Sequence, residues 1–320
     1  MNRREFVVAA TALAIAPEAF ARRLGGTPVA LVTADLESHV VAVDLSTGKR
    51  LRLIPTMSGP RSIERVGTTA VVAHTAHGAV SLIDGTKLRV RKVLRDFREP
   101  RYTASSLDGR YAFVTDSGLR AVVVVDVVRG RVVRRLGVGG PARHISTDRA
   151  GRRLWTALGT KAPRIAVVDV LDELRPRLLG TIKPPFLAHD VGFAPSGDVT
   201  WVTSGDQREL ALFDPRTARA VKRYRAGAPP QHVTFSGRLA FVTSGGDGTL
   251  RTHNAADGRV LRTARVPFGS YNVQEGWEGQ AILTPSLSRG TLCVADRRGR
   301  LVRRLDVARS SHDACFVVVD

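Results

Sequence analysis

Short apolar runs recur along the chain and end in threonine or histidine, as in "ALVT", "AFVT", "LWT", "TWVT" and "AILT". The final residues of these runs are spaced by 41, 41, 41, 47, 40 and 41 residues. They are Thr33, His74, Thr115, Thr156, Thr203, Thr243 and Thr284. A repeat of about forty residues that holds about four short strands predicts a β-propeller.

Each repeat divides into four segments, which we call strands A to D. Strand A ends in a glycine-containing turn such as "SLDGR", and strand B is the run that ends in threonine or histidine. Strand C, as in "AVVVVD", usually ends in an acidic residue that is followed by a turn. The side chain of this residue can accept hydrogen bonds from the backbone N–H groups of the turn. Strand D is rich in arginine, as in "RVVRRLGV". We predict structural turn roles for Asp44, Asp126, Asp214 and Asp296.

The chain enters this pattern at a strand B ("VALVT") and leaves it at a strand A ("DACFVVVD"). The last segment therefore supplies the innermost strand of the blade that the first segment begins. The leading residues of the strands A are Ser62, Tyr102, His144, His189, His232, Asn272 and His312. We predict an all-β fold, a seven-bladed β-propeller of four-stranded antiparallel blades, closed by a three-plus-one clasp of the N- and C-terminal strands.

Three stretches carry a resemblance to a known family: "VTDSGLRAVVVVD", "VTSGDQRELALFD" and "VGGPARHISTDRAGRRLW". By these motifs the mature chain resembles the YVTN-repeat family of seven-bladed β-propellers. The resemblance implies the fold and leaves the function open, because propellers host many unrelated activities.

The N-terminus resembles an export signal. Residues 1–21 have a basic start, a short apolar stretch and the small-x-small sequence Ala19-Phe20-Ala21, which predicts cleavage before Arg22. "NRREFV" resembles a twin-arginine signal, and an ordinary Sec signal is the alternative. We predict a signal peptide over 1–21, a single propeller domain over 22–320, no membrane span after cleavage, and a periplasmic or extracellular location.

The net charge is +20, and 43 of the 49 basic residues are arginine. Arginine is concentrated in the strands D, the outer edges of the blades, where charge deters edge-to-edge pairing. We expect a monomer whose basic rim also suits polyanions and envelope surfaces. Cys293 and Cys315 fall in different blades, which favours buried free thiols over a disulfide.

The recurring histidines admit two interpretations. In an antiparallel pair the head of strand A lies beside the tail of strand B, which predicts structural histidine–threonine contacts. The pairs are His144–Thr156, His189–Thr203, His232–Thr243 and His312–Thr33. Alternatively, because strand A lines the central channel, the leading residues ring its mouth and are available to a ligand.

Arginines precede the leading residue on three successive blades and suit carboxylate or phosphate groups. The sequence predicts a ligand site at the channel mouth for a protein or a small anionic molecule. Its candidate residues are Arg61, Arg101, Tyr102, Arg143, His144, His189, His232, Asn272 and His312.

No cofactor or metal is predicted. Imidazoles that project to the axis suit copper or zinc, but Ser62, Tyr102 and Asn272 interrupt the ring, and the chain has no CxxCH haem-attachment motif. We favour a binding or scaffold protein of the cell envelope. A lactonase-type hydrolase for a small anionic substrate is the alternative, with a redox propeller third. The carboxylates at this face are Asp35, Asp116, Asp190 and Asp206, and no catalytic residue is assigned.

One repeat is longer than the others, at 47 residues. Its extra length places Phe186 and Leu187 just before His189, where they suit either a partner contact or ordinary loop variation. Trp155 and Trp201 are predicted to pack inside blades, and Trp277 to lie in a turn between strands A and B on the opposite face.

Overall fold

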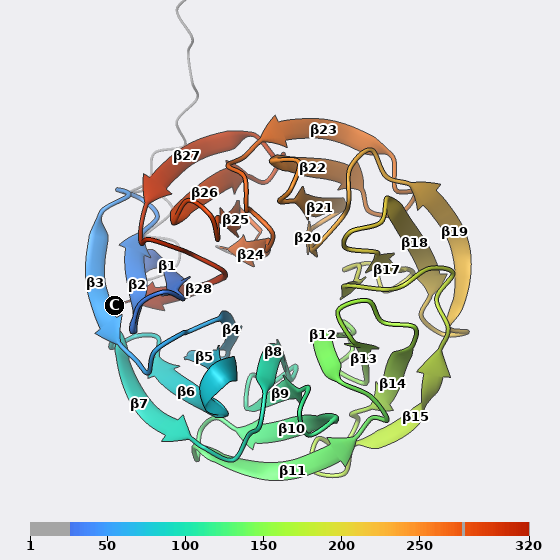
Figure 1. Cartoon of the computed structure of the whole chain (residues 1–320), viewed down its shortest axis with the longest axis horizontal. Coiled ribbons are helices and arrows are strands. Elements are labelled where there is room, and N and C mark those ends of the chain that lie inside the picture. The colour runs from blue at the N-terminus through green and yellow to red at the C-terminus, as the bar shows by residue number, and fades with distance from the viewer. Residues whose placement is uncertain (1–25, 277–278, 320) are drawn as a thin grey trace, which may run out of the picture.

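The structure, a computed structural model, describes residues 26–276 and 279–319. They form seven four-stranded antiparallel sheets, arranged as blades around a central channel (Figure 1). The predicted seven-bladed propeller is confirmed. The predicted signal peptide and Trp277 lie outside the described residues.

The strands of each blade are given from the innermost to the outermost. Blade 1 consists of β28 (Ala314–Val319), β1 (Thr27–Ala34), β2 (His39–Asp44) and β3 (Arg50–Pro55). Blade 2 consists of β4 (Ser62–Val66), β5 (Thr69–His74), β6 (Ala79–Asp84) and β7 (Arg89–Leu94), and the short 3-10 helix η1 (Thr75–His77) follows β5. Blade 3 consists of β8 (Pro100–Ser105), β9 (Tyr111–Asp116), β10 (Ala121–Asp126) and β11 (Arg131–Gly137). Blade 4 consists of β12 (Ala142–Thr147), β13 (Arg153–Leu158), β14 (Ile165–Asp169) and β15 (Arg177–Ile182).

The remaining blades continue in the same order. Blade 5 is β16 (Val191–Phe193), β17 (Thr200–Thr203), β18 (Glu209–Asp214) and β19 (Arg219–Arg225), and blade 6 is β20 (Val233–Ser236), β21 (Leu239–Ser244), β22 (Thr249–Asn254) and β23 (Val260–Arg265). Blade 7 is β24 (Gln274–Gly276), β25 (Ala281–Pro285), β26 (Thr291–Asp296) and β27 (Leu301–Asp306).

The two ends of the chain close the ring. β28 pairs with β1 in antiparallel register, with Leu31 opposite Cys315. The backbone N–H of Thr33 extends this pairing by donating to the Asp313 carbonyl, 2.9 Å away. The predicted three-plus-one clasp is therefore confirmed, and the inner edge of β1 is covered by β28 rather than left open.

The hydrophobic core lies between neighbouring blades. Seven clusters of buried apolar residues are present in the described chain, and each joins the facing sides of two adjacent sheets. The cluster between blades 7 and 1 includes Leu283 and Phe316, so the clasp strand packs directly against the last blade. Trp155 and Trp201 are fully buried in two further clusters, as predicted. Cys293 and Cys315 are buried free thiols in blades 7 and 1.

The outermost strands carry the exposed arginines. In β19 all residues except Tyr224 are exposed, and β3, β23 and β27 show similar patterns. Every pairing of a third strand with an outermost strand contains a register shift. Charge and local bulging both make these edges poor templates for pairing with another sheet.

The acidic residues that end the third strands hold the following turns. One side-chain oxygen of Asp44 accepts the backbone N–H groups of Ser46 and Thr47. Asp126, Asp214 and Asp296 accept turn N–H groups in the same way, which confirms their structural role.

A bridge between blades 4 and 5 holds the longer repeat in place. Ala162 forms an isolated bridge with Ala188, which fixes the loop that precedes β16. Phe186 packs against the cluster between blades 4 and 5 and is half-buried, whereas Leu187 is exposed. Of the two apolar residues, only Leu187 is free to meet a partner.

No helix within residues 26–276 and 279–319 has the length and apolar composition needed to cross a bilayer.

Phe316 provides a test of the clasp, because it is the largest side chain that β28 contributes to the core. Phe316→Ala should lower the free energy of unfolding by about 3 to 5 kcal/mol, through lost burial and the remaining cavity. Urea denaturation measures this loss, and Val128→Ala, at an exposed turn position, should change stability by no more than about 0.5 kcal/mol. Equal stability of the two variants would contradict the clasp.

Candidate functional site

The heads of the innermost strands converge on the central channel. A cavity of about 290 Å³ lies there, lined by residues of all seven blades that include Tyr102, His144, His232 and Asn272. Each of these is a predicted leading residue, so the ring expected from the repeat is present. It forms because equivalent positions of the blades face one axis.

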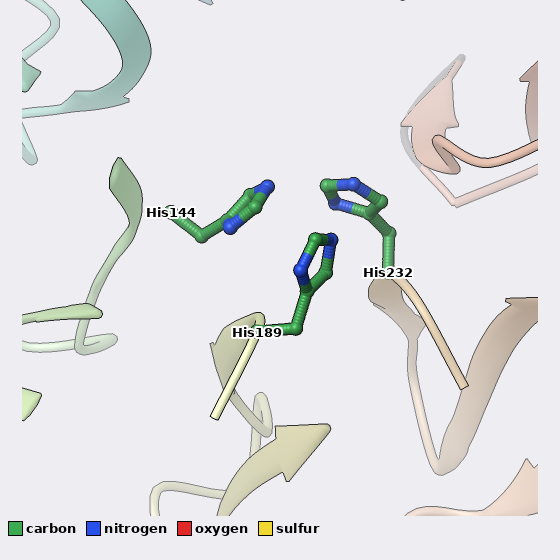
Figure 2. A group of neighbouring side chains, drawn as sticks. All are labelled: His144, His189 and His232. Carbon is green, nitrogen blue, oxygen red and sulfur yellow. The ribbon is translucent and has the colours of Figure 1, made fainter. Parts of the chain in front are cut away.

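Three imidazoles of this ring face one another. His144 at β12, His189 before β16 and His232 before β20 come from consecutive blades and point together (Figure 2). The ring centroid of His144 lies 4.3 Å from that of His189 and 4.6 Å from that of His232. One ring nitrogen from each residue lies within 4.8 Å of the other two. His189 is half-buried, and the other two are buried.

The partners of the three imidazoles differ. Nδ1 of His189 lies 3.0 Å from the Thr160 carbonyl, and Nδ1 of His232 lies 3.4 Å from a carboxylate oxygen of Asp190. His144 is 1% exposed, and neither of its ring nitrogens has a hydrogen-bond partner among residues 26–276 and 279–319. The His189 backbone is close enough to His144 to favour its charged form, but no hydrogen bond of normal geometry forms. A buried imidazole without a partner is unusual, because buried polar groups are normally satisfied.

Burial and mutual repulsion keep two of the three imidazoles, His144 and His189, uncharged. Burial, and then the neighbouring His189 and His232, hold the pKa of His144 well below its usual value. Burial, and then His232, lower the pKa of His189 to about 4. Both imidazoles are therefore neutral at neutral pH and offer lone pairs.

The fourth histidine of the ring is part of a different contact. Nδ1 of His312 lies 3.0 Å from the Arg61 carbonyl and 3.2 Å from Nδ2 of Asn272. Nδ2 of Asn272 also donates to the His312 carbonyl at 2.9 Å. Because Asn272 lies in blade 7 and His312 leads into blade 1, this contact supports the closure of the ring.

The predicted contacts between histidine and threonine side chains are wrong. The threonines bond to backbone instead: Thr203 Oγ1 accepts the N–H of Asp190 at 3.2 Å and donates to the Gln231 carbonyl of the next blade at 2.6 Å. In other blades the equivalent threonine hydroxyls also donate to backbone carbonyl groups. These threonines are Thr33, Thr115, Thr243 and Thr284. The hydroxyl of Thr156, in contrast, has no hydrogen-bond partner in the described part of the chain. The register does bring the two chain segments together, but strand alternation turns the imidazole toward the axis.

The predicted arginines surround the imidazoles, and two of them are paired. Arg61 lies 3.4 Å from Asp35, and Arg101 lies 3.4 Å from Glu99. Arg143 is half-buried and has no carboxylate within ion-pair distance among the described residues. Burial lowers the pKa of Arg143, and its contact with the Tyr102 hydroxyl opposes this shift.

Tyr102 completes the mouth beside the arginines. Its ring centroid lies 4.0 Å from that of His144. Burial raises the pKa of its hydroxyl to about 12, although Arg143 acts in the opposite direction. The phenol therefore stays protonated at neutral pH and can donate a hydrogen bond.

Three of the four predicted carboxylates have structural partners. Asp116 accepts three backbone N–H groups of the loops around it. Asp35 accepts a hydrogen bond from Ser310, and Asp206 forms an ion pair with Lys161. Loop anchoring explains each of these carboxylates.

Asp190 is different because it faces the channel. Its oxygens accept the N–H groups of Val191 at 2.8 Å and Val233 at 3.0 Å, which joins blade 5 to blade 6. The sequence places it beside His189, whereas the structure pairs it with His232 of the next blade. A contact between residues of two blades cannot be predicted from which residues are adjacent in the sequence.

The channel also contains acidic residues that the sequence analysis missed. Glu64 and Asp313 line the cavity with Gln274, whose amide donates to Glu64 at 3.2 Å. Alternation along a strand was the available signal, because Glu64 and Gln274 lie two residues after the leading residues Ser62 and Asn272. The mouth is thus basic and the channel below it is acidic.

No protein-family model matches the chain. Protein NirF of Stutzerimonas stutzeri is 25% identical over 166 residues, which is 52% of this chain and 41% of NirF. The matched part is thus well under half of that relative's length. The resemblance to YVTN-repeat propellers stays a prediction.

Solved structures with the same fold include hydrazine synthase of Kuenenia stuttgartiensis, with a TM-score of 0.67, 16% identity, and coverage of 80% of this chain and 89% of that one. Dihydro-heme d1 dehydrogenase NirN in complex with DHE has a TM-score of 0.65 at 15% identity, covering 89% of this chain and 74% of NirN. At these identities the likeness shows a shared propeller fold.

Thr203→Val should lower the free energy of unfolding by about 1 to 3 kcal/mol, because the Asp190 N–H would lose its buried acceptor. Urea denaturation measures the effect, and Thr217→Val, at an exposed turn position, is the control with a change near zero. A Thr203→Val variant as stable as wild type would contradict the backbone role of this hydroxyl.

Glu64 should make stability depend on pH. Burial raises its pKa from 4.5 to about 7. An acid with a raised pKa stabilises the fold below its unfolded value, and this contribution is lost as pH rises through its folded value. The stability of Glu64→Gln should therefore match that of wild type near pH 4.5 and exceed it above pH 7 by about 3 kcal/mol. Thermal unfolding across this range measures the difference, and a constant difference would contradict the assignment.

Proposed function

We propose that this protein binds a small anionic ligand at the mouth of the central channel. The observation that carries the proposal is Arg143, a half-buried guanidinium without a carboxylate partner in the described part of the chain. A partly desolvated cation gains from an anion, and the guanidinium fork suits carboxylate or phosphate.

The neighbouring arginines support the same role. The ion pairs of Arg61 and Arg101 are partly exposed, with side-chain exposures of 44% and 23% for the two arginines. Such pairs contribute little to stability, so both guanidinium groups can turn to a ligand at small cost. The hydroxyl of Tyr102, beside Arg143, adds a hydrogen-bond donor.

The charge distribution favours a ligand that stops at the mouth. Glu64, Asp190 and Asp313 line the channel below the arginines. An anion held at the mouth meets the arginines there, whereas the described residues that line the cavity below include no arginine or lysine. Burial raises the pKa of Glu64 and of Asp313, which favours the neutral forms of these two carboxyl groups.

A carboxylated tetrapyrrole is the first ligand class to test. NirN is solved in complex with DHE, and half of this chain aligns with NirF. The guanidinium groups of the mouth suit the carboxylates of such a molecule, and the ring of Tyr102 beside them offers an aromatic contact. When bound, an iron tetrapyrrole would supply redox chemistry.

The hydrolase alternative rests on one contact. The pair of His232 and Asp190, with 3.4 Å between Nδ1 and the carboxylate oxygen, has the arrangement of a general base and its orienting group. Hydrolysis of a lactone panel that is lost in His232→Ala, with folding retained, would support this alternative over simple binding.

We further propose that the protein acts outside the cytoplasm as a monomer. The export-signal-like sequence of residues 1–21 supports this. The exposed arginines of the outer strands suit contact with anionic envelope surfaces.

The anionic-ligand proposal is tested with metal-free protoporphyrin IX, a dicarboxylate, in a fluorescence titration. Arg143→Ala should weaken binding by about tenfold to a hundredfold, because a charge-assisted hydrogen bond contributes about 1.5 to 3 kcal/mol. Arg143→Lys should weaken it less, since the charge remains and the fork is lost.

Arg134→Ala is the matched control, because Arg134 is an exposed arginine of the outer strand β11. It removes the same charge far from the mouth and should leave affinity unchanged. Equal losses in Arg134→Ala and Arg143→Ala would show rim binding only. Failure of wild type to bind the porphyrin or simple di- and tricarboxylates would overturn the proposal.

A further inference from the structure

The convergence of His144, His189 and His232 has no structural explanation of the kind that His312 has. His312 is bonded to Asn272 and to backbone at the ring closure. No hydrogen bond links the three converging rings to one another within the described chain. Packing three imidazoles together without such bonds is unfavourable, because His144 and His232 are buried and His189 is half-buried, so each loses hydration.

The outer contacts of two of the rings leave the inner nitrogens available. When Nδ1 of His189 donates its hydrogen to the Thr160 carbonyl, Nε2 of the neutral ring carries no hydrogen and its lone pair is available to a ligand. With Nδ1 of His232 facing the Asp190 carboxylate, the same tautomer is favoured there. A carbonyl or carboxylate behind the ring is the usual arrangement around metal-bound histidine, since it fixes the tautomer and the ring orientation.

His144 supplies the third and most direct observation. It is 1% exposed, both ring nitrogens lack partners, and the ring faces the other two. A nitrogen ligand that awaits an ion accounts for this better than a packing role does, because an apolar side chain would fill the same space without the desolvation penalty.

We propose that these three histidines bind a divalent transition-metal ion of the borderline class, Zn²⁺ or Cu²⁺, at the inner end of the channel mouth. Imidazole nitrogen is a preferred ligand for both ions. Ring nitrogens within 4.8 Å of one another can close on an ion with metal–nitrogen distances of about 2.0 to 2.1 Å through small side-chain rotations.

Three protein ligands leave a fourth position open, as in zinc sites that bind water or a substrate. Arg143 directly precedes His144 in β12, at the same end of the channel. An anion held by Arg143 would therefore lie near the open position. The metal site does not depend on the anionic-ligand proposal, and either can fail alone.

Asp190 is a positioning residue in this site. It contacts His232 and not the ion, and its oxygens are held by two backbone N–H groups. Asp190→Asn preserves the shape but removes the negative charge behind the imidazole. Loss of such an outer partner typically lowers metal affinity by about tenfold to a hundredfold.

The test is calorimetric titration of the untagged, chelator-treated protein with Zn²⁺ at neutral pH. Wild type should bind one equivalent. His144→Ala, His189→Ala and His232→Ala should each weaken binding by more than about a hundredfold, and Asp190→Asn by about tenfold or more. Saturating Zn²⁺ should raise the melting temperature of wild type and not that of His144→Ala.

Two histidine variants are matched controls. His253→Ala removes a buried imidazole with an unpartnered Nε2 in β22, outside the cluster. His312→Ala removes the fourth histidine of the ring. Both should retain wild-type Zn²⁺ affinity. Arg143→Ala should not weaken Zn²⁺ binding, which separates the metal site from the anionic-ligand site.

Electron paramagnetic resonance of wild type loaded with one equivalent of Cu²⁺ keeps the proposal testable if a variant does not fold. Hyperfine coupling to three imidazole nitrogens is expected. Absence of stoichiometric binding of both ions to wild type would overturn the proposal, as would Zn²⁺ affinity that is unchanged in His144→Ala or lost equally in His312→Ala.

Discussion

Pairing of β28 with β1 is the constraint on which the rest of the structure depends. It joins the two ends of the chain in one sheet, and it places Phe316 in the cluster between the last blade and the first. Without it the ring would have an open inner edge and two unsatisfied blade faces. Closure fixes the number of blades, and the number of blades fixes how near the axis the heads of the innermost strands come.

This closure converts a sequence repeat into a chemical gradient along the channel. Equivalent positions of successive blades become neighbours around the axis, so the arginines, the leading residues and the residues two positions later form successive layers. Arg61, Arg101 and Arg143 make the mouth basic, His144, His189 and His232 lie next to them, and Glu64, Asp190 and Asp313 lie in the channel cavity below. The layers follow from strand alternation combined with rotational repetition.

The same ring contains polar contacts of two kinds. Threonine hydroxyls such as that of Thr203 bond to backbone within a blade and to the next blade, and they hold the wall of the channel together. The imidazoles stand inside this wall and, in blades 4 to 6, are not needed for it. Because the threonine hydroxyls form the hydrogen bonds that hold the channel wall, the histidine ring nitrogens are available to a ligand. The clearest case is His144, whose two ring nitrogens have no partner among the described residues.

The sequence by itself determined the architecture, because a period of about forty residues, apolar strand patterns and turn aspartates are local properties. It also determined which residues lead each innermost strand, and hence the members of the ring. Only the tertiary structure decided how these members divide. His232 faces Asp190 of another blade, and His312 pairs with Asn272 of blade 7 instead of Thr33; both are contacts across blades. Among the described residues, Arg143 is also the one of the three arginines without a carboxylate partner. Such contacts depend on side-chain direction and on the curvature of the closed ring, which the order of residues along one chain does not contain.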